Sequence, residues 1–216
     1  MERLALFDLD NTLISLAGAF RLFVAEFAQQ HGLEAADLAW FAEAGESGYL
    51  NRAELFEAVR SRCGLGASST DLLTHYRARM PELVRCEPEV FAGLADLRVA
   101  GWRLGIVTNG NVGNQQAKVD LTGLAAAVDA VCVSEGVGIR KPDPRIFRLA
   151  IERAGCSADG GGWMVGDNAE ADIEGGRAAG LRTIWVAGRA DAEWPRASEG
   201  PDHIVESVVE AISLLR

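Results

Sequence analysis

The segment RLALFDLDNTLIS, residues 3–15, contains a short apolar run that stops at two carboxylates. Residues 4–7 have the continuous apolar character of a buried strand, and Asp8 and Asp10 follow at once. A single Asp after a strand is more often a turn or capping residue than a catalytic group. The chemistry of these two acids therefore depends on which other residues the fold brings beside them.

The order of the predicted elements indicates an α/β fold with an insertion. After the first strand, residues 15–87 contain only helical patterns, at 16–31, 35–44, 51–63 and 71–80. Strands and helices then alternate, with strands at 103–108, 130–134, 163–167 and 182–187, and helices at 89–100, 112–122, 144–154, 169–179 and 205–215. This alternation predicts a Rossmann-like parallel sheet with helices on both faces. We expect an α/β core of residues 1–14 and 88–216, with residues 15–87 as an inserted all-α domain.

Polar residues mark several of the expected helix starts. Asn51 is a candidate N-cap with Glu54 as its capping-box partner, and either Ser69 or Thr70 is expected to cap the helix that follows. Asp143 followed by Pro144 is typical of a helix start. Residues 188–201 are expected to form a long polar loop. Residues 202–203, Asp-His, are interpreted as two loop residues.

Composition excludes several classes of function. The chain has 216 residues, 49% of them hydrophobic, and a net charge of −10. The sequence contains no Lys/Arg run, so nucleic acid is not an expected partner. No apolar run approaches membrane-spanning length, and residues 1–7 read as a core strand instead of a signal peptide. The four scattered cysteines suit reduced thiols. These features favour a cytoplasmic protein, expected as a monomer or homodimer.

Four chemically capable side chains are predicted to meet at one edge of the sheet. Asp8, Thr108 and Asp167 lie at the ends of three strands, and Lys141 lies in the loop after a fourth. Each has an ordinary structural explanation when taken alone, as a turn residue, a cap or a solvated charge. Ligands of open parallel sheets bind outside the carboxyl ends of the strands, however, so their common location predicts a functional site.

The segments DLDNT, TNG, KPDP and VGDNAEAD, in this order, resemble the four motifs of the haloacid dehalogenase-like hydrolases. The helical insertion resembles the helical cap of that family. The resemblance implies that Asp8 is a nucleophile and that Mg²⁺ is the cofactor. By similarity, the Asp8 and Asp167 carboxylates and the Asp10 backbone carbonyl bind the ion, while Asp172 binds or orients a metal-bound water.

The resemblance also assigns the phosphate contacts. Lys141, the Thr108 hydroxyl and the Asn109 backbone N–H would hold the phosphate oxygens. Asp10 would donate a proton to the leaving group and later accept one from water. Because halide release needs no such proton, Asp10 favours a phosphatase, which would hydrolyse a small phosphorylated metabolite through an aspartyl-phosphate.

Alternatives remain open on the sequence alone. A haloacid dehalogenase or a sugar-phosphate mutase could use the same scaffold, and so could a non-catalytic binding protein. Tyr49 and Arg52 are candidate substrate contacts from the inserted domain, although a plain helix–helix connection explains them equally well. Asn111, Gln115 and Lys118 follow the second motif and are placed near the phosphate; their segment is similar to that of superfamily members acting on nucleotides or sugar phosphates.

Overall fold

Six parallel strands form one sheet in the order β3-β2-β1-β4-β5-β6. The computed structural model describes residues 3–46, 50–188, 193–195 and 199–216. The strands are β1 (Leu4–Phe7), β2 (Arg103–Thr108), β3 (Ala130–Val133), β4 (Trp163–Gly166), β5 (Arg182–Val186) and β6 (His203–Val205). The parallel α/β sheet predicted from the alternating pattern is confirmed.

The first strand occupies a central position in this sheet. β1 pairs with β2 on one side, where Phe7 is opposite Ile106, and with β4 on the other, where Phe7 is opposite Val165. All four β1 residues are fully buried. Because both faces of the sheet are covered by helices, a central strand reads as a continuous apolar run, and no alternation is seen.

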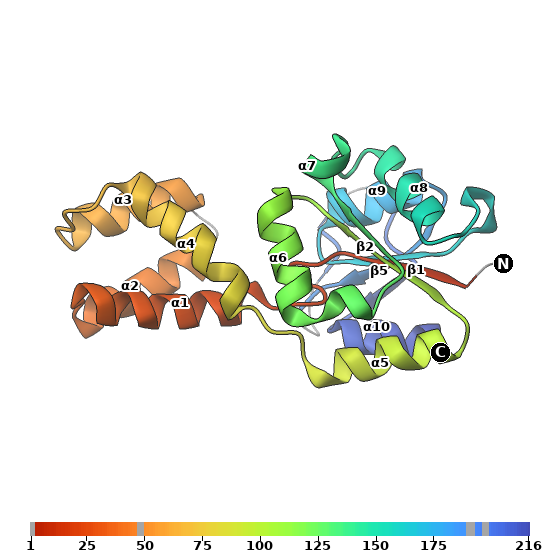
Figure 1. The fold of residues 1–216 in the computed structure, drawn as a ribbon, viewed down its shortest axis with the longest axis horizontal. Coiled ribbons are helices and arrows are strands. Elements are labelled where there is room, and N and C mark those ends of the chain that lie inside the picture. The colour runs from red at the N-terminus through yellow and green to blue at the C-terminus, as the bar shows by residue number, and fades with distance from the viewer. Residues whose placement is uncertain (1–2, 47–49, 189–192, 196–198) are drawn as a thin grey trace. The chain divides into compact units, whose positions relative to one another are not determined.

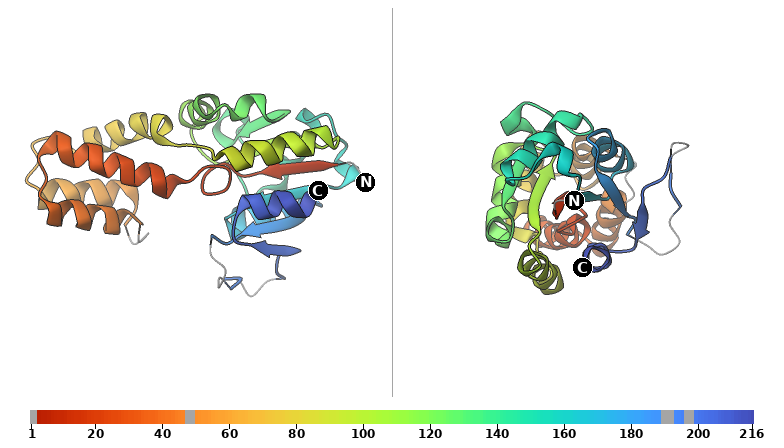
Figure 2. Two further views of the ribbon diagram at one scale, coloured as in Figure 1. Left: turned by 90° about the horizontal axis from the view of Figure 1, so that it is seen from below. Right: turned by 90° about the vertical axis from the view of Figure 1, so that its right-hand side faces the viewer.

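Helices cover both faces of the sheet (Figures 1 and 2). α5 (Pro88–Val99) and α10 (Val208–Leu215) pack together on one face, and α8 (Pro144–Arg153) and α9 (Gly175–Ala178) pack together on the other. α6 (Val112–Thr122) packs against β3. The other short helices of this region are α7 (Ser134–Val137), η1 (Leu124–Ala126), η2 (Ala158–Gly160) and the π-helix η3 (Ala169–Glu174).

The C-terminal part of the sheet differs from the prediction. His203, interpreted as a loop residue, begins β6, which pairs in parallel with β5. The Asp202 carboxylate accepts hydrogen bonds from the backbone N–H and the hydroxyl of Thr183, and so fixes the start of this strand. The predicted helix at 205–215 consequently begins at Val208. The predicted helix at 169–179 is present over residues 169–178, but its first part is a π-helix and only its last turn, α9, is α-helical.

The chain divides into two compact units: Met1–Ile14 with Cys86–Arg216, and Ser15–Arg85. The second unit contains α1 (Leu16–His31), α2 (Ala35–Glu46), α3 (Arg52–Arg62) and α4 (Ser69–Leu83). The predicted capping box of Asn51 and Glu54 is present. The predicted cap of α4 is wrong, because Ser68, not Ser69 or Thr70, accepts the hydrogen bond from the Asp71 N–H.

Aromatic rings form the core of the helical unit. Edge-to-face and tilted contacts, with ring centroids 5.1–6.3 Å apart, connect Phe20, Phe23, Phe27, Phe41, Phe56 and Tyr76. The Arg52 guanidinium lies 4.3 Å from the centroid of the Phe20 ring and donates to the Gly45 carbonyl oxygen. The contacts of Arg52 within its own unit are therefore those of a structural residue. Tyr49 lies outside the described residues.

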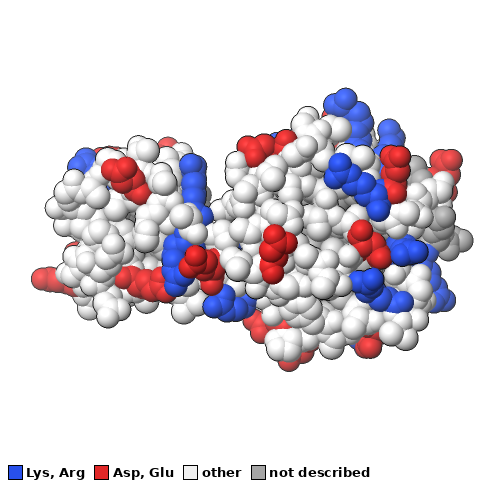
Figure 3. Space-filling model, viewed as in Figure 1, with Lys and Arg blue, Asp and Glu red and all other residues white. Residues whose placement is uncertain are grey.

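Acidic and basic side chains are interspersed on the visible face of the α/β unit (Figure 3). None of the described helices is both long enough and apolar enough to cross a lipid bilayer.

Candidate active site

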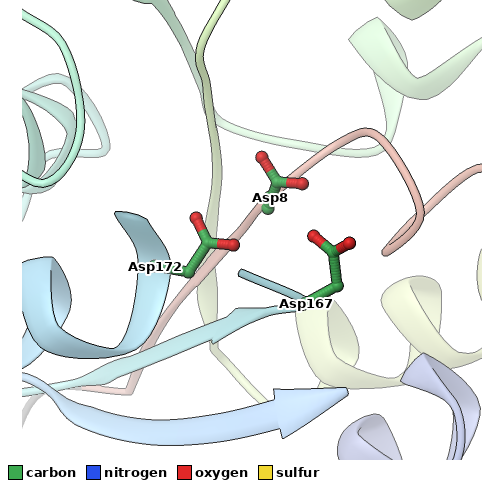
Figure 4. A group of neighbouring side chains, drawn as sticks. All are labelled: Asp8, Asp167 and Asp172. Atoms are coloured by element: carbon green, nitrogen blue, oxygen red, sulfur yellow. The ribbon is translucent and has the colours of Figure 1, made fainter. Parts of the chain in front are cut away.

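Three carboxylates from separate parts of the sequence meet at the carboxyl end of the sheet. Asp8 follows β1, Asp167 follows β4, and Asp172 lies in η3 (Figure 4). Each offers one oxygen within 4.8 Å of the others. Asp8 and Asp172 are buried, and Asp167 is partly buried.

Local backbone contacts hold these acids in place. The backbone N–H of Asp8 donates to the Val165 carbonyl oxygen at 2.9 Å, so the β1–β4 pairing continues through the nucleophile candidate. The Trp185 indole N–H donates to the Asp167 carbonyl oxygen at 2.7 Å. Gly166 leaves room for Asp172, because a Cβ at this position would lie 2.4 Å from the Asp172 Cγ.

Lys141 supplies the positive charge at the centre of the cluster. Its Nζ lies 2.5 Å from Asp8 Oδ1, 2.6 Å from Asp172 Oδ1 and 2.7 Å from the Val107 carbonyl oxygen, and its side chain is 2% exposed. These three acceptors satisfy the three N–H donors of an ammonium group. A lysine so buried is tolerated only because its charge is paired.

Asn109 fixes the backbone of this lysine. Its side-chain amide donates to the Lys141 carbonyl oxygen at 3.0 Å, and its Oδ1 accepts from the Lys141 N–H at 2.9 Å. The expectation for Asn109 concerned its backbone N–H; the structure adds a role for its side chain that sequence reasoning missed.

The carboxylates have shifted proton affinities. Burial raises the pKa of Asp8 to about 7, an effect that Lys141 opposes and that the Asp172 and Asp167 charges reinforce. Burial, reinforced by Asp172, raises the pKa of Asp167 to about 6. Burial alone would lower the pKa of Lys141, but its two carboxylate partners reverse this and raise it. When all three carboxylates are ionised, the cluster carries more negative charge than the single ammonium of Lys141 compensates.

This donor set fits a hard divalent cation. Three carboxylates whose oxygens lie within 4.8 Å of one another are the ligand type that Mg²⁺ prefers. A divalent ion would also offset the repulsion between the carboxylates that adds to burial in raising the pKa of Asp8 and Asp167. We conclude that the residues present are chemically suited to Mg²⁺.

The contacts of Asp10 differ from those of the three clustered acids. Both of its carboxylate oxygens lie 2.8 Å from Lys118 Nζ, and Oδ2 also accepts from Gln115 Nε2 at 3.1 Å. Gln115 Nε2 in turn lies 2.6 Å from the Thr108 hydroxyl oxygen. The Asp10, Thr108 and Gln115 side chains are thus brought together, and Lys118 joins them by contacting both Asp10 and Gln115.

The side-chain hydrogen bonds of Asn111 are with residues outside this group. Asn111 caps α6 and donates to the exposed carboxylate of Glu135.

The pairing of Lys118 with Asp10 was not predicted, although the rarity of lysine in this chain points to it. Among the 21 Lys and Arg residues of the chain, only residues 118 and 141 are lysines. Both are buried, and both contact an acid of the first motif.

Comparison with known proteins places this geometry in context. A family model described as haloacid dehalogenase-like hydrolase matches residues 2–180. The phosphoserine phosphatase of Thermus thermophilus is 42% identical over 111 residues, covering 51% of this chain and 44% of that protein. The pyrophosphatase PpaX of Bacillus velezensis is 33% identical over 156 residues, covering 70% of this chain and 71% of that protein. The match to the first relative thus spans less than half of its length.

A solved structure is similar over nearly the whole chain. The HAD-hydrolase YfnB of Bacillus subtilis, bound to magnesium, is 27% identical and superimposes with a TM-score of 0.74. The alignment covers 99% of this chain and 98% of that one.

Proposed function

The chain belongs to the haloacid dehalogenase-like hydrolases, and we propose that it is a Mg²⁺-dependent phosphatase that hydrolyses a small phosphomonoester metabolite through an aspartyl-phosphate. The observation that carries this proposal is the contact of Asp8 with Lys141 beside Asp167 and Asp172 at one edge of the sheet. Relatives named as phosphatases support the reaction class.

Asp8 is the proposed nucleophile. Its carboxylate oxygen forms a bond to phosphorus while the bond from phosphorus to the leaving oxygen breaks. Asp8 and Asp167, with the Asp10 backbone carbonyl, would hold Mg²⁺, and Asp172 would orient a water on it. When bound, the ion supplies positive charge that allows the anionic carboxylate and phosphate to approach.

Lys141, Thr108 and the Asn109 backbone N–H are the proposed phosphate contacts. Lys141 Nζ is held at Asp8, so its charge is placed beside the bond that forms. The Asn109 side chain holds the Lys141 backbone in place through two hydrogen bonds. These groups are positioned before substrate binds, and preorganised charge of this kind lowers the free energy of a charged transition state.

Asp10 is the proposed acid and base. It gives a proton to the departing alkoxide; in the second step it takes a proton from the water that attacks phosphorus. This attack releases inorganic phosphate and regenerates the Asp8 carboxylate. A dehalogenase would release halide, which needs no proton, so Asp10 favours the phosphatase over that alternative.

The helical unit is the proposed cap. Its position in the sequence, between Asp8 and Thr108, supports this role, as does its likeness to the family's cap. Four free cysteines support a reducing compartment, and we place the protein in the cytoplasm.

The reaction is tested by phosphate release from a panel of phosphorylated metabolites in Mg²⁺ and in excess EDTA. We expect activity only with the ion, and none in the Asp8→Asn variant. Borohydride added during turnover should convert Asp8 to homoserine, identified by peptide mass, because it reduces an acyl phosphate. Equal rates with and without EDTA, or a fully active Asp8→Asn variant, would disprove the mechanism. Halide release from 2-chloropropionate without metal would favour the dehalogenase.

A further inference from the structure

Lysine is used selectively in this chain. Nineteen of its 21 basic residues are arginine, yet the two buried positions that face carboxylates of the first motif are lysine. Lysine carries a compact charge with three donors in adjustable directions, whereas arginine carries a wide planar fork. The role of Lys141 follows from its contact with Asp8. Lys118 needs a separate explanation, because it contacts Asp10 and not the three clustered acids.

The ammonium of Lys118 determines which way the Gln115 amide faces. Lys118 Nζ lies 2.9 Å from Gln115 Oε1, and an ammonium group can only donate. The oxygen of this amide must therefore face Lys118, and its nitrogen must face the opposite way. There, Nε2 lies 2.6 Å from Thr108 Oγ1 and 3.1 Å from Asp10 Oδ2. The donor direction in this network thus runs from Lys118 to Gln115 and onward to Thr108.

The Thr108 hydroxyl oxygen accepts this hydrogen bond, and its own hydrogen is left for another acceptor. Among the residues that the structure describes, this hydroxyl donates to no partner. A hydroxyl that already accepts from an amide is set to act as a donor, which is what binding a phosphate oxygen requires. If Gln115 faced the other way, its carbonyl oxygen would compete with phosphate for the hydroxyl hydrogen.

The backbone is shaped to admit the Gln115 side chain. A Cβ at residue 110 would lie 2.7 Å from the Gln115 Cγ, so the glycine there allows the close approach. Lys118 also holds both oxygens of Asp10, with its own side chain 6% exposed. One helix, α6, therefore fixes a proposed phosphate donor and a proposed proton donor at once.

We propose that Lys118 and Gln115 are positioning residues: Lys118 fixes the Gln115 amide, and together they orient the Thr108 hydroxyl toward phosphate and hold the Asp10 carboxylate in place. The inference rests on the proposed function for the roles of Thr108 and Asp10. The contacts themselves can be tested without turnover.

The first test uses substrates that differ in their need for a proton. An alkyl phosphate such as glycerol 2-phosphate leaves as an alkoxide, whereas p-nitrophenyl phosphate leaves as a stable anion. We expect Lys118→Met to lower kcat on the alkyl phosphate by about 10²-fold or more, and on the aryl phosphate much less. Equal loss on both substrates would show that Lys118 does not act through the proton-transfer role of Asp10, and would overturn that part of the proposal.

The second test concerns phosphate binding. Gln115→Glu has the same shape but no amide donor, so the Thr108 hydroxyl would turn toward the new carboxylate. We expect weaker inhibition by inorganic phosphate, by about tenfold, as for the loss of one hydrogen bond to a charged group. The matched control is Gln116→Glu, whose side chain bonds Asp120 on the exposed side of α6. Unchanged phosphate inhibition in Gln115→Glu would overturn the orientation of Thr108.

The third test separates this inference from the proposed function. With lysine labelled at Cε by ¹³C, the folded protein should give two lysine side-chain signals, assigned by Lys118→Met. Asp10→Asn and Gln115→Glu should each move the Lys118 signal, and Gln116→Glu should not. A Lys118 signal unaffected by Asp10→Asn would overturn the proposal whatever the activity. If these shifts appear but no phosphate ester is hydrolysed, the proposed function fails while the positioning contacts stand.

Discussion

Lys141 Nζ lies 2.5 Å from Asp8 Oδ1, although 133 positions separate the two residues in the chain. The contact spans the sheet edge from the end of β1 to the loop after β3. It holds the Lys141 ammonium beside the proposed nucleophile, and the same ammonium also donates to Asp172.

Replacing Lys141 by methionine should remove both activity and stability. We expect phosphate release to fall by about 10²–10³-fold, the effect of losing one charged donor at a transition state. The free energy of unfolding should fall by about 3–5 kcal/mol, because two buried carboxylates lose their partner. The measurements are steady-state kinetics and urea unfolding. Arg140→Met, at an exposed neighbouring position, is the control; an equal effect there would refute a specific role for Lys141.

Replacing Gly166 by alanine should displace Asp172. The new Cβ would lie 2.4 Å from the Asp172 Cγ, so the acid or the strand must shift. We expect a loss of about 1–3 kcal/mol in urea unfolding, the usual cost of overpacking, together with weaker Mg²⁺ binding.

Gly66→Ala is the matched control for Gly166→Ala. A Cβ there meets nothing within 4 Å, so this variant should unfold like the parent chain. Equal unfolding curves for both alanine variants would show that the site adapts without cost.

Mg²⁺ should stabilise the protein more at pH 8 than at pH 6. The pKa of Asp8 is raised to about 7 and that of Asp167 to about 6, so the metal-free folded state holds protons that the unfolded chain releases near pH 4. The stability from these groups is present below pH 4 and is lost as pH rises through 6 and 7. Above pH 7 both acids are charged, and the ion can bind without displacing protons.

Thermal unfolding at both pH values, with Mg²⁺ and with EDTA, measures this difference. Asp8→Asn should reduce the Mg²⁺-induced rise in Tm at pH 8. A Tm rise that is the same at both pH values would argue against binding at these carboxylates.

Replacing Asn109 by alanine should loosen Lys141 without removing it. Two hydrogen bonds to the Lys141 backbone would be lost, at a cost of about 1–3 kcal/mol in the free energy of unfolding. If the transition state is destabilised by the same free energy, kcat should fall by roughly tenfold or more. Gln116→Ala, on the exposed side of α6, should change neither quantity. An Asn109→Ala variant with unaltered kcat would show that Lys141 holds its position unaided.

Several features of this protein could be predicted from its sequence. The alternation of strand and helix patterns after the helical insertion predicted the parallel sheet. The ends of the strands predicted that Asp8, Thr108 and Asp167 would lie along one edge, because parallel strands place all their carboxyl ends on the same side. The helix N-caps at Asn51 and Asp143 were also predicted, because capping depends only on residues that are neighbours in the sequence.

Other features were decided by tertiary structure. β6 has three residues, two of them exposed, and forms because β5 offers a free edge and Asp202 binds Thr183. The π-helix arises where the Asn168 carbonyl oxygen accepts from both the Asp172 and the Ile173 N–H, a choice that periodicity does not reveal. The Lys118–Asp10 pair depends on which side of α6 is turned to the sheet edge. Sequence patterns predict the elements and the edge at which the strands end, whereas tertiary packing decides which side chains contact one another there.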